Sequence, residues 1–301
     1  FVSLPHTEGC GVSDEKPGAA TLLGHLASPL VHSCLLLEHG CEKTHNDYFT
    51  QLLTSHGLDP ARFGWASLQA DGGVAAVRSK VDGWFASKLP KALPPAEQRV
   101  RAPLATLGVG LLVCPPPPSL TETTTLPDGI ALCFARLCGM LSRRGLVVLP
   151  NGSALLSHPT FLEHCLAETP RAKLAYGQHV HHRPAAHLLL DELPKEDDAT
   201  AVAPSSSSTG LHVMQMPSDR WVEIASGLGA SGVHMLLAWR YKGMPSPAGH
   251  PMVPMLTIAL EEEEGGCASA VPYADVMLRP SDGAVEWSKA VLERVQSLAS
   301  G

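Results

Sequence analysis

Two clusters of histidine, cysteine, carboxylate and glycine residues each follow a short apolar run, and they hold the residue types best suited to chemistry. The first is residues 5–11, Pro-His-Thr-Glu-Gly-Cys-Gly, after the apolar run 1–4. The second is residues 38–47, Glu-His-Gly-Cys-Glu-Lys-Thr-His-Asn-Asp, after the run 33–37. Thiol, imidazole and carboxylate groups bind metals or move protons, and glycine lets the backbone approach a ligand closely. We therefore expect a site where these clusters meet.

A third polar turn follows the next apolar run. Residues 69–73 read Gln-Ala-Asp-Gly-Gly, and a helical pattern begins directly after them. The N-terminal amides of that helix are suited to receive an oxyanion such as a substrate carboxylate. A plain tight turn, in which the two glycines only relieve the backbone, is the alternative.

The elements that position these clusters alternate between strand and helix along the first 180 residues. Alternation of this kind predicts an α/β fold with a mainly parallel sheet, in which strand ends of like direction share an edge and ligands bind at that edge. We expect strands at 1–5, 32–38, 65–69, 104–114, 146–149 and 173–176, and helices at 18–27, 46–56, 73–87, 129–143 and 158–167. In the C-terminal part we expect strands at 211–214, 233–239 and 254–260 and helices at 221–227 and 285–298.

A change in composition suggests where the chain divides. Residues 191–198 are strongly acidic and residues 205–208 are all serine. Such composition is typical of a flexible linker or an exposed loop. We therefore predict an α/β domain over 1–190, a linker over 191–210, and a smaller C-terminal α/β domain over 211–301.

Composition excludes several function classes. The chain has 301 residues, a formal net charge of −7 and only 5% aromatic residues, which argues against a nucleic-acid partner. It lacks an apolar run near the roughly 20 residues that span a bilayer. Its eight cysteines form no CxxC pair, so we expect reduced thiols in a soluble protein of the cytoplasm, with an organellar matrix as the alternative. The chain opens on Phe1 and not on Met, so we expect further residues before it in the full protein.

Several segments, in order along the chain, resemble the altronate/galactarate dehydratase family of sugar-acid hydro-lyases. In the N-terminal part these are residues 1–11, 36–42 and 69–73. In the C-terminal part they are Gly-Leu-His-Val-Met at 210–214, Trp-Val-Glu at 221–223, Gly-Leu-Gly-Ala-Ser-Gly-Val at 227–233 and Gly-His-Pro-Met-Val-Pro at 249–254. The resemblance covers about residues 1–85 and 210–258.

The resemblance implies a metal-dependent dehydration of a sugar acid or related hydroxy acid. Such a reaction needs a base, an acid and a positive centre for the carboxylate, which a divalent metal supplies. We expect iron or manganese, with zinc as the alternative because thiolates favour it. The candidate metal ligands are Glu8, Cys10, Cys41 and Glu42, the candidate catalytic residues are His6, His45 and Lys43, and the candidate substrate-binding residues are Thr7, Gly9, Gly11, Gly72, Gly73, His212 and Glu223.

Structural roles are the alternative for several of these residues. Cys10 and Cys41 would then only pack at tight strand ends, and His6 would be a turn residue. Asn46 or Asp47 would cap the following helix. His212 and Glu223 would either line the cleft or only support it.

The chain also departs from the family pattern, and the departures favour a second hypothesis. Family members usually carry a Gly-Gly-Ser-Asp stretch near the middle, where this chain has residues 110–118 ending in four prolines. Family members also carry an N-terminal small β domain, which we expect this chain to lack before Phe1. The second hypothesis is therefore a catalytically inactive dehydratase-like subunit, acting as a homo-oligomer or with a separate chain that supplies the missing domain. Nucleophilic catalysis by Cys10 or Cys41 is a third reading, and it requires a histidine within hydrogen-bond reach.

Overall fold

The computed structural model describes residues 2–5, 16–28, 30–88, 107–113, 125–143, 145–165, 172–180, 209–241, 249–261 and 274–299. Its helices are α1 (Lys16–Leu26), α2 (Asn46–Ser55), α3 (Val74–Lys88), α4 (Asp128–Leu141), α5 (Pro159–Cys165), α6 (Trp221–Ala230) and α7 (Ala284–Ala299). Its strands are β1 (Leu35–Glu38), β2 (Gly64–Ser67), β3 (Gly108–Leu112), β4 (Leu146–Pro150), β5 (Ala172–Leu174), β6 (Gly210–Met214), β7 (Met235–Trp239), β8 (Met255–Leu260) and β9 (Val276–Leu278). Within these ranges no helix is long and apolar enough to cross a membrane.

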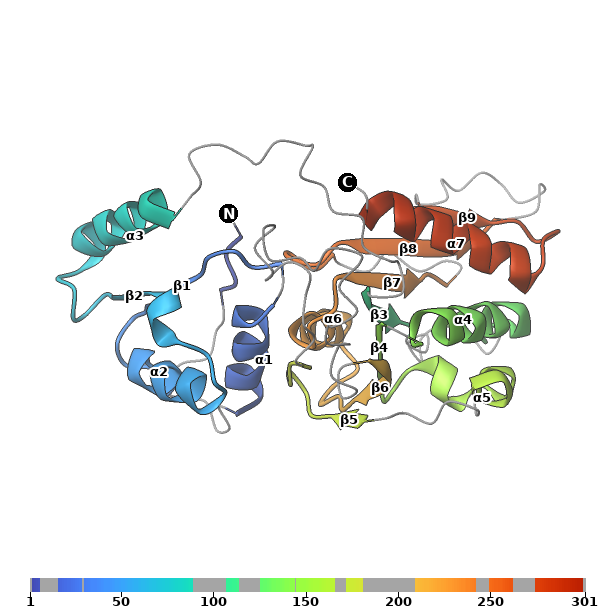
Figure 1. Ribbon diagram of the computed structural model, residues 1–301, viewed down its shortest axis with the longest axis horizontal. Coiled ribbons are helices and arrows are strands. Elements are labelled where there is room, and N and C mark those ends of the chain that lie inside the picture. Colours follow the sequence, from blue (N-terminus) through green and yellow to red (C-terminus); the bar gives the residue numbers. More distant parts are fainter. Residues whose placement is uncertain are drawn as a thin grey trace, which may run out of the picture.

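Seven of the strands form one parallel sheet, in the order β5-β6-β4-β3-β7-β8-β9 (Figure 1). The remaining two, β1 and β2, form a separate parallel pair. Strands and helices alternate along the chain in both sheets. The predicted α/β class with a parallel sheet is therefore confirmed.

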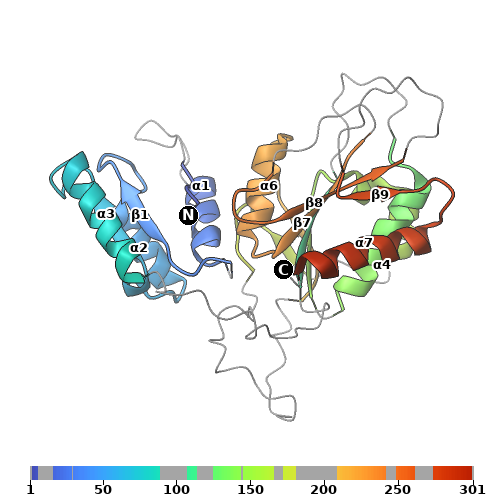
Figure 2. The same ribbon diagram turned by 90° about the horizontal axis from the view of Figure 1, so that it is seen from above.

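The centre of the large sheet is buried on both faces, because β3, β4 and β7 are apolar and buried at every position. Val109, Leu111 and Val113 face one core, which α4, α5 and α7 cover. Leu112 faces the opposite core, which α6 covers. Figure 2 shows α6 on one side of the sheet and α4 and α7 on the other. Continuous apolar strands of this kind are typical of parallel sheets covered on both faces.

The smaller unit has a core of its own. Ala19 and Leu23 of α1 pack with Phe49 and Leu53 of α2 and with Phe63, which precedes β2. The β1–β2 pair runs in register from Leu35 opposite Gly64 to Glu38 opposite Ser67. The two strands therefore end at the same edge, which brings the loops after them together.

Helix α1 joins the two units, because it belongs to the core of the smaller unit and also packs against α6 (Figure 2). Gly24 makes this approach close: a Cβ atom there would lie 2.3 Å from the carbonyl oxygen of Ala230. The two helices therefore meet through backbone and small side chains.

Three findings differ from or add to the predicted elements. Residues 2–5 form no strand, so the strand expected at 1–5 is wrong for its described part, where the Val2 side chain is 53% exposed. Strand β9 was not predicted. The large sheet contains β3, β4 and β5, which precede the predicted linker 191–210, together with β6 to β9, which begin at Gly210. Strands from both predicted domains therefore share one sheet, and the domain boundary itself stays a prediction.

Candidate functional site

The loops that follow β1 and β2 interlock at the C-terminal edge of the small sheet. The backbone N–H of Leu68 donates to the carbonyl of Glu38 at 3.0 Å, and that of Gln69 donates to the carbonyl of His39 at 3.1 Å. Gly40 has a φ of 114°, and a Cβ atom there would lie 3.0 Å from the Gln69 side chain. Only glycine fits this position without strain. The second and third polar clusters of the sequence therefore share one site.

Glu42 closes the first of these loops with its own carboxylate. The carboxylate oxygens accept the backbone N–H groups of His39 at 2.6 Å, Gly40 at 2.8 Å and Cys41 at 3.1 Å. Partial burial raises the pKa of Glu42, but these backbone hydrogen bonds lower it more, and the net pKa lies below the usual value. The charged carboxylate thus holds the loop in a tight turn.

A thiol, an imidazole and an amide gather on the exposed side of this loop. The Sγ atom of Cys41 lies 3.4 Å from Nδ1 of His39, which is within hydrogen-bond reach for sulfur. The Nε2 atom of Gln69 lies 3.5 Å from the same Nδ1 atom. Cys41, His39 and Gln69 are all exposed. These three groups come from two different βα units and share one small area of the surface.

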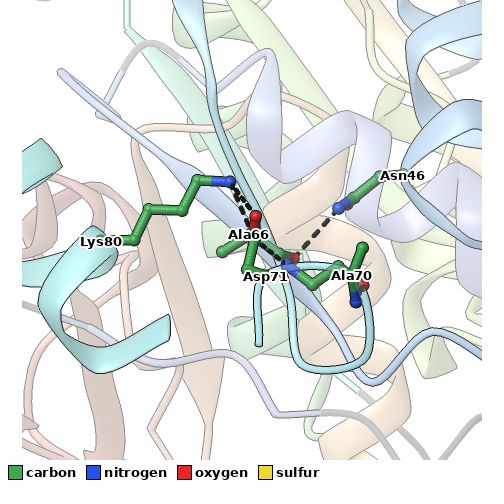
Figure 3. Close-up of polar contacts among 6 residues, drawn as sticks. Asn46, Ala66, Ala70, Asp71 and Lys80 are labelled. Carbon is green, nitrogen blue, oxygen red and sulfur yellow. Dashed lines mark hydrogen bonds and ion pairs between the residues drawn. The ribbon is translucent and has the colours of Figure 1, made fainter. Parts of the chain in front are cut away.

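Asn46 ties the start of α2 to both strands. Its backbone N–H donates to the carboxylate of Glu38, and its Nδ2 atom donates to the carbonyl of Ala66 at 3.0 Å (Figure 3). His45 is the N-cap of α2, because its Nδ1 atom accepts the backbone N–H of Tyr48 at 3.3 Å. The cap is thus one residue earlier than the alternative expected at Asn46 or Asp47.

The third cluster forms a closed turn between β2 and α3. The carboxylate of Asp71 accepts both the backbone N–H of Ser67 at 2.8 Å and the Nζ atom of Lys80 at 2.7 and 2.8 Å (Figure 3). The side-chain hydrogen bond from Lys80 is the main reason why the pKa of Asp71 lies below its usual value. Gly72 and Gly73 have φ values of 86° and 88°, and the N–H of Gly73 donates to the carbonyl of Leu68 at 2.9 Å. The tight-turn alternative therefore describes the geometry of the glycines.

The other predicted site residues have varied positions. The whole first cluster, His6, Thr7, Glu8, Gly9, Cys10 and Gly11, lies outside the described residues. Lys43 is exposed on the loop before α2. His212 lies within β6 of the large sheet and is fully buried, with its Nε2 atom 3.3 Å from the carbonyl of Thr209. Glu223 lies in the first turn of α6 and pairs with Arg220 at 3.7 Å.

A metal centre needs at least three suitable side chains around one point. Among the residues that the structure describes, no three histidine, cysteine, aspartate or glutamate side chains are arranged to hold a metal ion. Of the four candidate ligands, Cys41 and Glu42 are described, and the Glu42 carboxylate is directed at its own loop. These two residues therefore form no metal centre by themselves.

Two residues of the site were not among the sequence candidates. His39 and Gln69 link the loops, whereas the sequence candidates in the same segments were Cys41, Glu42, Lys43, His45, Gly72 and Gly73. The available signal was their position at the predicted strand ends, since His39 directly follows the predicted strand 32–38 and Gln69 is the last residue of the predicted strand 65–69. Such signals indicate that a residue lies at the edge but not which way its side chain points.

Comparison with known proteins adds no identification. No protein-family model matches this sequence, and no curated protein matches it.

Proposed function

We propose that this protein is a hydro-lyase that removes water from a sugar acid or a related hydroxy acid at the C-terminal edge of β1 and β2. The observation that carries the proposal is the convergence of His39, Cys41 and Gln69 from two successive βα units. Strand ends of parallel sheets are where ligands bind in α/β proteins. The resemblance of residues 1–11, 36–42 and 69–73 to sugar-acid dehydratases supports the same edge.

The reaction requires three functions of the chain. A base takes the proton from the carbon next to the carboxylate, and the electron pair left behind forms the carbon–carbon double bond. The neighbouring hydroxyl leaves with an added proton as water, and the enol product rearranges to a 2-keto-3-deoxy acid. Imidazole is the natural group for proton transfer near neutral pH, and both His39 and His45 present exposed rings beside the loop. The exposed ammonium of Lys43 is suited to pair with the substrate carboxylate.

A screen with sugar acids tests this proposal. The purified protein, with and without added Fe²⁺ or Mn²⁺, is incubated with a panel of aldonic and aldaric acids, and 2-keto-3-deoxy acid is measured. We expect turnover of at least one substrate, and a loss of about 100-fold or more in kcat/KM for His39→Gln or His45→Gln when the replaced ring is the acid or base. His56→Gln, at the exposed C-cap of α2, is the matched control and should keep full activity.

An inactive dehydratase-like subunit is the second candidate, and a specific observation favours it. Glu42, Asp71 and His45 each use their polar atoms to close a turn or cap a helix. Such hydrogen bonds stabilise the loops whether or not the protein is catalytically active. This candidate predicts no turnover with any sugar acid or metal, and no stoichiometric iron, manganese or zinc in the purified chain. Metal that Cys41→Ala removes, together with turnover, would instead exclude it.

A further inference from the structure

Two histidines from the two structural units meet where α1 packs against α6. His25 lies on α1 and is 5% exposed, and the half-buried His250 lies in the segment before β8. Their Nε2 atoms are 3.1 Å apart, and their rings are almost parallel, with 9° between the planes. A Cβ atom at Gly229 would lie 2.5 Å from Nε2 of His250, so the ring rests directly on the backbone of α6.

The hydrogen-bond partners fix where the protons of this pair reside. The Nδ1 atom of His250 faces the backbone N–H groups of Met252 at 3.1 Å and Val253 at 2.9 Å, so it must accept. Its proton is then on Nε2, which donates to Nε2 of His25. The Nδ1 atom of His25 lies 2.7 Å from the carbonyl of Thr21, so it must donate. Every ring nitrogen is thus satisfied with both rings neutral.

An additional proton has no place in this arrangement. On His25 it would occupy Nε2 and face the N–H of His250. On His250 it would occupy Nδ1 and face two backbone N–H groups. Burial accordingly lowers the pKa of His25, and burial together with the neighbouring His25 lowers the pKa of His250 to about 4.

Among the residues that the structure describes, the remaining contacts of this interface are small and the nearby charges are few. Gly24 meets Ala230, and a Cβ atom at Gly177 would lie 2.6 Å from the backbone nitrogen of Thr21. The two apolar cores on either side do not merge across it. The titratable and charged groups on the packed elements are Lys16 at the start of α1, Arg220 and Glu223 at the start of α6, Tyr176, whose hydroxyl donates to the carbonyl of Glu223, and His179, whose ring lies beside Gly232.

We propose that the His25–His250 pair is a proton-sensitive latch that holds α1, and with it the β1–β2 unit, against the seven-stranded sheet. Above about pH 6.5 both histidines are neutral whether the latch is open or closed, and the closed form has its full stability. Below that pH, a histidine in the open form binds a proton that the closed form does not bind. The stability of the closed form relative to the open form therefore falls until the pH reaches the lowered pKa. For one histidine that shifts from about 6.5 to about 4, the closed form loses roughly 30-fold in population relative to the open form between pH 7.5 and 5.0.

Amide hydrogen exchange of the purified protein, corrected for intrinsic rates, tests the latch. We expect the protection of α1 to fall by at least about 30-fold from pH 7.5 to 5.0, while α4 in the core of the large sheet keeps its protection. His250→Gln should reduce the protection of α1 at pH 7.5 and remove most of its pH dependence. His164→Gln is the matched control, since the exposed His164 also bonds the carbonyl four residues before it, at 2.8 Å. His179→Gln should likewise leave the pH dependence in place.

Direct titration by NMR tests the same proposal without substitution, in case the His250 variant does not fold. The ring of His250 should stay neutral down to at least pH 5.5, and the ring of His25 should titrate below the usual histidine value. Titration of all rings at the usual value would overturn the latch. A change of less than threefold in α1 protection between pH 7.5 and 5.0, or an equal pH dependence in His250→Gln, would also overturn it.

Discussion

Replacement of Asn46 by alanine should loosen the edge that holds the candidate site. The Asn46 carboxamide donates to the carbonyl of Ala66, a residue that is only 1% exposed, at 3.0 Å (Figure 3). Loss of this donor leaves the buried carbonyl of Ala66 without this hydrogen bond, which should lower the stability by about 1–2 kcal/mol. The backbone N–H of Asn46, which donates to Glu38, is retained in the variant. The change therefore isolates the side-chain link between α2 and β2.

Hydrogen exchange of the amides in β1 and β2 measures this link. A cost of about 1–2 kcal/mol corresponds to roughly a 5- to 30-fold loss of protection when the strands open locally. Thr54→Ala is the control: it also removes a side-chain hydrogen bond to a carbonyl, 2.8 Å long, but on the exposed face of α2. If Asn46→Ala leaves the protection of both strands within twofold of the native value, the carboxamide does not hold the edge together and the reasoning is refuted.

Three further predictions concern other parts of the molecule. Gly24→Ala should weaken the docking of α1 by about 1–3 kcal/mol, because the new Cβ atom would lie 2.3 Å from the carbonyl oxygen of Ala230; unchanged exchange of α1 would contradict this. Burial raises the pKa of Cys133 to about 12, so mass spectrometry should find it unlabelled by iodoacetamide at pH 8 while the exposed Cys41 reacts. The lysine that bonds Asp71 lowers its pKa, so this carboxylate stabilises the fold above about pH 4 and loses that effect as the pH falls through its folded value. An NMR titration midpoint of Asp71 at or above that of a free aspartate would refute this expectation.

Sequence patterns predicted the large sheet well because its strands are buried on both faces. Apolar runs such as those in β3, β4 and β7 leave few alternatives when glycine or proline bounds them. The run at residues 1–4 was also mainly apolar, but its described residues pair with no strand. Strand β9 has only three residues and is defined by its pairing with β8, from Ile258 opposite Val276 to Leu260 opposite Leu278. A run of three or four residues does not reveal whether a partner strand exists.

Helix α6 shows how a local rule can select the wrong residue. Glycine often ends a helix, and the sequence therefore predicted an end at Gly227. The helix instead continues to Ala230, and Gly232, with a φ of 84°, follows its end. Gly227 and Gly229 lie inside the helix because Tyr176 and His250 approach them, at 2.6 and 2.5 Å from where a Cβ atom would be. Such contacts between distant segments cannot be read from the residues of the helix alone.

The candidate site separates residues that serve the loops from residues that face the solvent. The second and third polar clusters meet at one strand edge because strand direction fixes that meeting, whereas the expected meeting of the first and second clusters stays a prediction, since residues 6–11 lie outside the described residues. The sequence could not indicate that Glu42 would direct its carboxylate at three amides of its own loop, since that depends on the path of four consecutive residues. Glycine at position 40 lets the loop turn far enough for this. This turn leaves Cys41 and His39 on the exposed side of the loop, beside Gln69. The loop carboxylate is therefore a positioning group, and the proposed proton transfer depends on the His39 imidazole that the loop holds outward.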